Sequence, residues 1–250
     1  PPTPRSRSAS PMHSSPVLPP ETLEGWYALH QLFTVDHAAL RALSPTERRR
    51  LLEDAAEGLG RLEATGGDAG WTRIVPLVGG KAELMLMHFR PTLDALGEVQ
   101  QEVRGLWLHD VLKPAYAFLS VTELGLYHLT AQLAREAAER GGAAGDEMYR
   151  TALLARTEAE RTSPFGQRRL YPTPPAEMPY VCFYPMSKRR APEQNWYALP
   201  LEERSRLMYA HGMTGRRYAG RVQQIISGAI GLAEWEGGVT LFGRDPLEFK

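Results

Sequence analysis

Chemically versatile side chains gather in the last third of the sequence. They are an oxidisable phenol at Tyr184, a cation at Lys188, an imidazole at His211 beside Gly212, and an amide at Gln224. A neutral imidazole is a good iron ligand, and a cation pairs readily with a carboxylate. This combination of side chains favours a flat, anionic, redox-active ligand over a generic apolar core.

The alternation of side chains along a strand indicates which of these residues share a face. In a regular strand, Tyr184, Met186 and Lys188 point together, with Lys188 at the mouth of the strand. In the strand that follows, Gln224 falls on an apolar side and Gln223 on the other. We therefore expect Gln224 to face the core, where its amide needs a hydrogen-bond partner.

The segment around His211 has the spacing of a helix. Leu207, His211 and Gly215 recur at intervals of four residues, which puts them on one stripe. The pattern predicts that His211 faces the interior, and Gly212 and Gly215 leave room beside it for a planar ligand. The spacing alone is more typical of a core histidine bonded to a carbonyl group.

Each of the other candidate residues also has a plainer reading. Tyr184 is typical of a packed core tyrosine, and Lys188 with Arg189 and Arg190 is typical of a solvated loop. The sharper hypothesis is that these cations bind ligand carboxylates, and Arg169 can do the same from a neighbouring segment.

Composition and missing motifs exclude several classes of protein. The 250 residues are 43% hydrophobic, and 29 basic side chains balance 29 acidic ones, so no net field attracts nucleic acid or an anionic membrane. Cys182 is the only cysteine, which excludes an intramolecular disulfide and fits a cytoplasmic setting; within an apolar strand it is expected to be an inert thiol. The sequence contains no phosphate-binding loop and no nucleophile elbow.

Hydrophobic periodicity predicts a β-α-β-β-α-β order in the first half, the ferredoxin-like unit. The first helix should begin at Ser44, with Pro45 and Glu47 completing a capping box. The strands are expected near residues 26–33, 71–78, 83–89 and 116–127, and the second helix near 92–107.

The second half restarts this order after a linking helix at about 146–161. A strand is predicted at 180–186, a helix at 200–217, and strands at 222–230 and 238–242. The chain stops before the helix and strand that would complete the unit, so we expect a fragment rather than an edge covered by another subunit. The predicted organisation is a Pro/Ser-rich disordered tail (1–22), an N-terminal unit (23–145), and a linking helix with a C-terminal unit (146–250).

The sequence resembles the chlorite-dismutase-like superfamily, and within it the coproheme decarboxylases of Gram-positive and related bacteria. The resemblance spans about Glu24 to Lys250. Its most specific motifs are Tyr184–Lys188, Asn195-Trp196-Tyr197, His211-Gly212 with Gly215-Arg216, Tyr218-Ala219-Gly220 and the run from Val222 to Phe242.

The resemblance implies an α+β fold in which two fused ferredoxin-like units form a dimeric α+β barrel, assembled as a homopentamer. It also implies oxidative decarboxylation of two propionates of iron-coproporphyrin III by hydrogen peroxide, giving haem b through a three-propionate intermediate. The iron porphyrin is then both substrate and redox centre. A transient contact with the coproporphyrin ferrochelatase is a further implication, with no nucleic-acid or membrane partner.

The resemblance also assigns roles to individual residues. His211 resembles the axial iron ligand, Tyr184 the residue that forms a radical and abstracts hydrogen from the propionate, and Lys188 the cation that binds that propionate. Arg169 resembles the arginine that holds another propionate. The remaining substrate-binding positions are Pro185, Met186 and Ser187 along the same wall.

Gln224 separates the branches of the superfamily. In the chlorite-splitting branch this distal position is an arginine, and an amide cannot supply its charge. The resemblance therefore favours coproheme chemistry over chlorite dismutase; a non-catalytic haem-binding or haem-transfer protein on the same fold is the other alternative. Two family features are missing: a propionate-contacting serine beyond Lys250, and a polar propionate contact in the segment 124–127.

Overall fold

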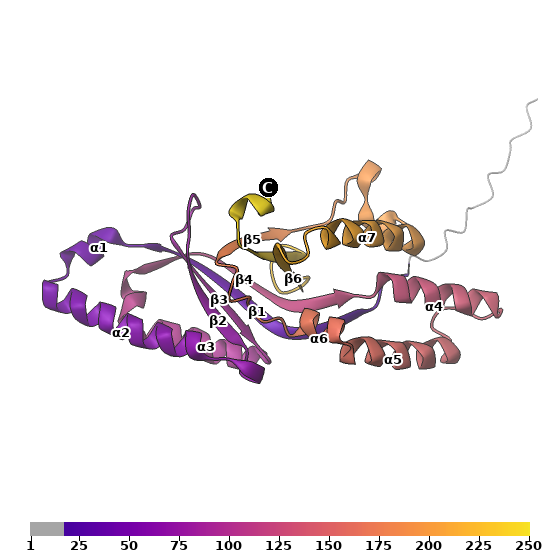
Figure 1. Cartoon of the computed structure of the whole chain (residues 1–250), viewed down its shortest axis with the longest axis horizontal. Helices are drawn as coiled ribbons and strands as arrows, with labels where there is room; N and C mark the ends of the chain where they lie inside the picture. The colour runs from indigo at the N-terminus through magenta and orange to yellow at the C-terminus, as the bar shows by residue number, and fades with distance from the viewer. Residues whose placement is uncertain (1–17) are drawn as a thin grey trace, which may run out of the picture.

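The computed structural model describes residues 18–250, in which seven strands form one antiparallel sheet flanked by helices (Figure 1). The strand order is β2-β3-β1-β4-β6-β7-β5. The predicted α+β class is confirmed. The predicted tail at 1–22 lies almost wholly outside the described residues.

The first half has the predicted β-α-β-β-α-β order, with one additional short helix. All neighbouring strands in it are antiparallel, in the order β2-β3-β1-β4. The elements are β1 (Thr22–Val35), α1 (His37–Ala42), α2 (Pro45–Ala64), β2 (Trp71–Pro76), β3 (Leu84–Arg90), α3 (Leu93–Gly105) and β4 (Leu112–Gly125).

The capping box predicted for α2 is present. The Ser44 backbone N–H donates to Glu47 Oε2 at 2.8 Å, and the Glu47 N–H donates to Ser44 Oγ at 3.3 Å. These two bonds satisfy backbone donors that the first turn of a helix leaves unpaired, and Pro45 has no N–H to satisfy. The helix buries Leu51 and Leu62, and Leu62 packs with Phe33 and Leu86 of the sheet.

The second half repeats the strand order of the first, because β6-β7-β5 corresponds to β2-β3-β1. The linking helix is confirmed as α5 (Glu147–Thr162), but α4 (Tyr127–Glu139) and α6 (Pro164–Leu170) were not predicted. Among the described residues, β5 pairs only with β7. The remaining elements are β5 (Tyr180–Met186), α7 (Leu201–Arg216), β6 (Val222–Gly228) and β7 (Gly237–Gly243).

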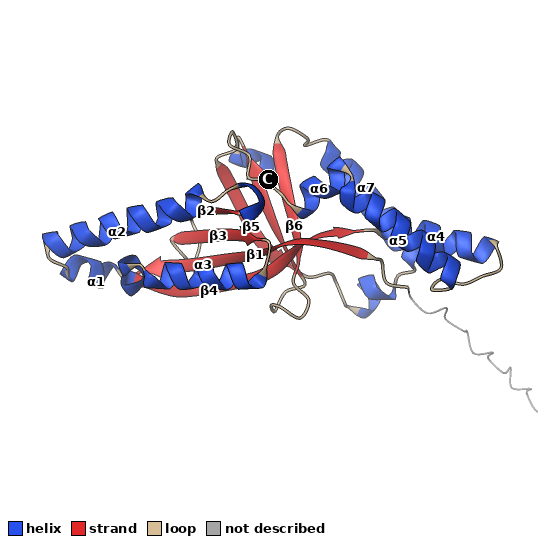
Figure 2. Cartoon of the chain, turned by 90° about the horizontal axis from the view of Figure 1, so that it is seen from below, coloured by secondary structure: helices blue, strands red, loops and turns tan. Residues whose placement is uncertain are grey.

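The main core lies between the two halves of the curved sheet. Trp71, Met87 and Phe89 of the first half pack in one cluster with Ile225 and Phe242 of the second. The halves are joined by a two-residue ladder between β4 and β6. Helices α1–α3 gather at one end of the molecule and α4–α7 at the other (Figure 2). In residues 18–250 no helix combines the length and apolar character needed to cross a membrane.

Candidate functional site

Strand β5 has two clearly different faces. Val181 and Phe183 pack against the main core. Tyr180, Tyr184 and Met186 lie on the opposite face and are 47%, 42% and 40% exposed. The prediction that Tyr184 and Met186 point together is confirmed, and the face that they share is open rather than packed.

Gln224 lies on this open face as well, which corrects its predicted orientation. Tyr184 and Ile226 both pair with Val239, so these residues and Gln224, two positions from Ile226, share a face. The residue that faces the core is Ile225, which is 3% exposed. The prediction was wrong because both faces of β6 carry aliphatic side chains, so alternation did not distinguish them.

Arg169 reaches the same strand from α6. Its Nη1 donates to the Gln224 carbonyl oxygen at 3.4 Å, and its Nε is buried without a hydrogen-bond partner among residues 18–250. Burial lowers the pKa of the Arg169 guanidinium, since desolvation disfavours the charged form. The guanidinium carbon lies 5.8 Å from the centre of the Phe165 ring. Arg169 is therefore a desolvated cation that still has capacity to bind an anion.

Lys188 lies just after the end of β5, beside a pocket of about 430 Å³. Its ammonium is 5.8 Å from the centre of the Trp196 ring, a cation–π distance. Its backbone N–H donates to Glu236 Oε2 at 3.0 Å. The pocket is lined by Ser187, Lys188, Arg189, Glu193, Gln194, Asn195, Trp196 and Leu199. The neighbouring Arg190 is bound to Glu236, so it is not a freely solvated cation as its loop suggested.

The structure adds Glu123, which the sequence reasoning missed. It lies on β4 against β6, so close that a Cβ at Gly228 would be 2.3 Å from its Oε2. Burial raises the pKa of the Glu123 carboxyl, and the negative charge of Glu24 raises it further. The positive charge of Lys188 acts in the opposite direction and lowers this pKa. The register that pairs Glu123 with Glu24 is seen only in the structure.

His211 is exposed, which contradicts its predicted interior orientation. All residues from 209 to 216 are exposed, including Tyr209 at 63% and Met213 at 42%. A Cβ at Gly212 or Gly215 would meet no atom within 4 Å. The buried residues of α7 lie only in its first turns, so the last turns carry apolar and imidazole side chains that no other described element covers.

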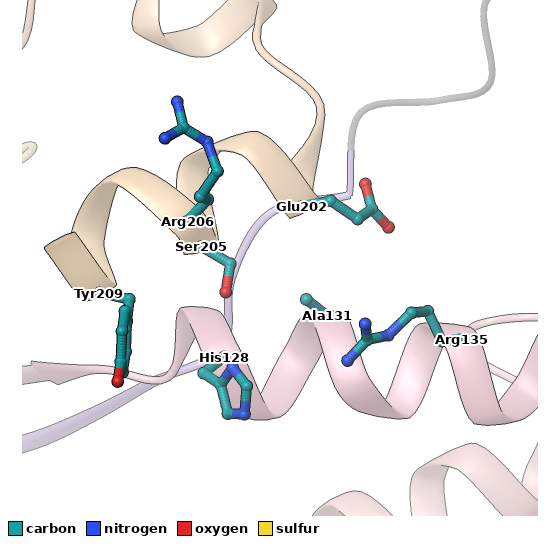
Figure 3. Close-up of a pocket in the computed structure, with 7 residues that line it drawn as sticks. All are labelled: His128, Ala131, Arg135, Glu202, Ser205, Arg206 and Tyr209. Atoms are coloured by element: carbon teal, nitrogen blue, oxygen red, sulfur yellow. The ribbon is translucent and has the colours of Figure 1, made fainter.

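A second hollow, of about 290 Å³, lies between α4 and α7 and does not belong to this site (Figure 3). It contains none of the predicted site residues. Its lining is His128, Ala131, Arg135, Glu202, Ser205, Arg206 and Tyr209.

Two further observations limit the chemistry. Within residues 18–250 there is no cluster of three or more His, Cys, Asp or Glu residues that could hold a metal ion. Cys182 is half-buried, and burial raises the pKa of its thiol, as expected for an unreactive cysteine.

The chain is similar to proteins of one family. The family model described as Chlorite dismutase matches residues 47–250. A coproheme decarboxylase of Staphylococcus saprophyticus is 38% identical over 232 residues, covering 92% of this chain and 83% of that protein. The structure of a haem-binding protein from Thermus thermophilus superposes with a TM-score of 0.76 at 36% identity, covering 93% of this chain and 83% of that one.

More distant structures support the fold alone. Chlorite dismutase from Candidatus Nitrospira defluvii, in complex with imidazole, superposes with a TM-score of 0.61 at 19% identity. That match covers 90% of this chain and 79% of the other.

Proposed function

This chain belongs to the chlorite dismutase family, and we propose that it is a coproheme decarboxylase. Its substrates are iron-coproporphyrin III and hydrogen peroxide, and its product is haem b, reached through a three-propionate intermediate. The 38% identical relative named coproheme decarboxylase supports this choice. The observation that carries it is that Tyr184 and Gln224 share one open face of the sheet, with Arg169 bound to the Gln224 backbone.

The described residues fit a large, flat, anionic substrate. The last turns of α7 expose His211 and apolar side chains on all sides, which is costly unless a ligand covers them. Gly212 and Gly215 add no side chain that would hold a planar ring away. Arg169 has a buried Nε without a partner among the described residues, as a carboxylate-binding cation should before its ligand arrives.

The reaction balances with one peroxide for each propionate. A propionic acid side chain and one hydrogen peroxide give a vinyl group, one carbon dioxide and two water molecules. The side chain loses two electrons, which the peroxide accepts. The iron of the bound substrate supplies the oxidising chemistry, so the protein has to bind, orient and deprotonate the reacting group.

The chain's own residues divide these tasks. His211 would bind the iron through its neutral imidazole, and Tyr184 would remove hydrogen from the propionate and carry the radical. Lys188 would hold the carboxylate of that propionate in its ionised form. Arg169 would fix a second propionate, which sets the orientation of the ring. Pro185, Met186 and Ser187 would line the wall between Tyr184 and Lys188.

Gln224 argues against chlorite dismutase as the activity. An amide offers a neutral donor where retention of an oxyanion requires a full positive charge. A haem-binding protein without catalysis remains the second candidate, because the Thermus thermophilus relative is described as haem-binding. We also propose that the protein is a cytoplasmic homopentamer and that it contacts the ferrochelatase transiently. Sedimentation velocity measures the number of subunits.

The decisive experiment is incubation with iron-coproporphyrin III and stoichiometric peroxide, followed by mass spectrometry of the porphyrin. Loss of two carboxyl groups at two peroxides per porphyrin supports the decarboxylase. Binding without loss of mass supports the haem-binding candidate. Sustained oxygen release from chlorite would support the dismutase, and absence of porphyrin binding would refute all three.

A further inference from the structure

The turn between β6 and β7 carries a glutamate that binds the segment after β5 at three points. Glu236 Oε2 accepts from the Lys188 backbone N–H at 3.0 Å and from the Tyr197 hydroxyl at 2.7 Å. Glu236 Oε1 accepts from Arg190 Nε at 2.9 Å. The Glu236 side chain is only 11% exposed. A single carboxylate therefore connects both ends of residues 188–197 to the sheet.

These bonds begin where the regular strand pairing ends. The last pair of the β5–β7 ladder is Met186 with Gly237. Beyond it, the Glu236 N–H donates to Ser187 Oγ at 3.2 Å, and its carboxylate accepts the next free N–H, that of Lys188. Side chains thus replace the main-chain ladder at the point where the chain leaves the sheet, and they fix the backbone of Lys188.

The carboxylate is held in its charged form. Burial on its own raises the pKa of Glu236, but hydrogen bonds from Tyr197, Lys188 and Arg190 outweigh it, so the pKa lies below its ordinary value. Arg190 also lies 4.8 Å from the centre of the Tyr197 ring. Glu236, Arg190 and Tyr197 therefore restrain one another.

We propose that Glu236 is a positioning residue, which holds Lys188 where its ammonium meets a carboxylate of the porphyrin. This inference rests on the proposed function, since it requires an anionic ligand at Lys188. It adds selectivity for porphyrins that carry the reacting carboxylates: without the bonds to Glu236, residues 188–197 leave the sheet and the Lys188 ammonium no longer faces the ligand. Glu236 itself does not contact the substrate.

Limited trypsin digestion tests the anchor without any ligand, because Lys188, Arg189 and Arg190 are three adjacent cleavage sites. Glu236→Ala should speed cleavage at these bonds about tenfold, the effect of losing several charge-assisted hydrogen bonds on local opening. Glu236→Gln should be intermediate, because its amide oxygen still accepts one N–H. The matched control is Glu177→Gln, whose carboxylate lies 3.7 Å from an exposed arginine elsewhere and should leave the cleavage rate unchanged.

A double-mutant cycle then tests the link to Lys188. In wild type, Glu236→Ala should weaken binding of iron-coproporphyrin III about tenfold; in a Lys188→Ala background it should have little further effect. Affinity for haem b, which lacks the two reacting carboxylates, should change little in either case. The conservative Glu236→Gln should recover part of the lost affinity.

The outcomes separate this inference from the function on which it rests. Equal tryptic cleavage of wild type and Glu236→Ala overturns the anchor, and so does an additive double-mutant cycle. If wild type binds no iron porphyrin while Glu236→Ala still accelerates cleavage, the proposed function fails and the anchor stands. If Glu236→Ala does not fold, the same comparisons are made with Glu236→Gln.

Discussion

Arg169 Nη1 donates a hydrogen bond of 3.4 Å to the carbonyl oxygen of Gln224. The two residues are 55 positions apart, on α6 and β6, and both were selected from the sequence as substrate-binding residues. Helix α6 therefore places the Arg169 guanidinium at the edge of the open face that carries Tyr184. Only one of the donors of the guanidinium is used by this contact, and the buried Nε has no partner among the described residues.

Replacing Arg169 should weaken substrate binding and stabilise the fold. Arg169→Met keeps the length of the side chain and removes a desolvated, unpaired charge, so the free energy of unfolding should rise by about 1 kcal/mol. Affinity for iron-coproporphyrin III should fall at least tenfold, roughly the value of one charge-assisted contact. Urea denaturation and absorbance titration measure the two quantities. Arg168→Met, an exposed neighbour on α6, should alter neither; a destabilised Arg169→Met would contradict the explanation.

Removing the hydroxyl of Tyr184 should separate binding from chemistry. Tyr184→Phe keeps the ring on the open face of β5, so affinity for iron-coproporphyrin III should change less than about threefold, the cost of one exposed hydrogen bond. Formation of haem b should stall, because phenylalanine cannot be oxidised to a radical under these conditions. Mass spectrometry of the porphyrin measures the result. Tyr180→Phe, on the same face of the same strand, is the control, and normal turnover of Tyr184→Phe would refute the assignment.

Iron ligation should depend on His211 and on no other exposed histidine. His211→Ala removes the imidazole from the uncovered turns of α7, and the absorption spectrum of bound ferric coproporphyrin should lose the features of histidine ligation. His128→Ala, in the separate hollow between α4 and α7, should leave that spectrum intact. An unchanged Soret band in His211→Ala would refute axial ligation.

Much of the fold could be predicted from the sequence because local signals and tertiary packing agree there. The capping box at Ser44 sets the start of α2, and alternation with flanking turns sets β5 at its observed bounds. Helix α4 was missed for a physical reason. It begins at Tyr127 with no side-chain cap, and it continues directly from β4 through aromatic and β-branched residues that favour a strand. From Ala131 onward the alanine, leucine, glutamate and arginine residues do favour a helix, and α4 also packs against α7.

The candidate residues could be selected from the sequence, but the surfaces on which they lie could not. Tyr184, Met186 and Arg169 lie where strand phase and proximity in the chain suggested. Gln224 and His211 were expected in the interior, because apolar neighbours normally indicate a core. His211 is instead exposed, and Gln224 is half-buried on the face that carries Tyr184. A sequence pattern does not distinguish a face packed by protein from one available to a ligand.

Two buried histidines should make the stability of the fold depend on pH. His30 Nε2 lies 3.1 Å from Thr240 Oγ1, and the His30 ring stacks on Phe183 at 4.0 Å. His88 Nδ1 lies 2.9 Å from Thr72 Oγ1. Both side chains are almost inaccessible to solvent. Burial lowers the pKa of each imidazole from 6.5 to about 3, with smaller contributions from neighbouring charged groups.

Because the folded-state pKa values are depressed, these histidines are neutral in the native protein and charged in the unfolded chain between about pH 3 and 6.5. The unfolded state then binds more protons, so stability is fully present above pH 6.5 and decreases as the pH falls through this window. From pH 6.5 to 5 the loss should be about 1.6 kcal/mol for each histidine, measured by urea denaturation. His30→Gln should remove about half of this pH dependence, whereas the exposed His128→Gln should retain all of it. Stability that is constant from pH 6.5 to 5 in wild type would show that the buried imidazoles are protonated in the folded state.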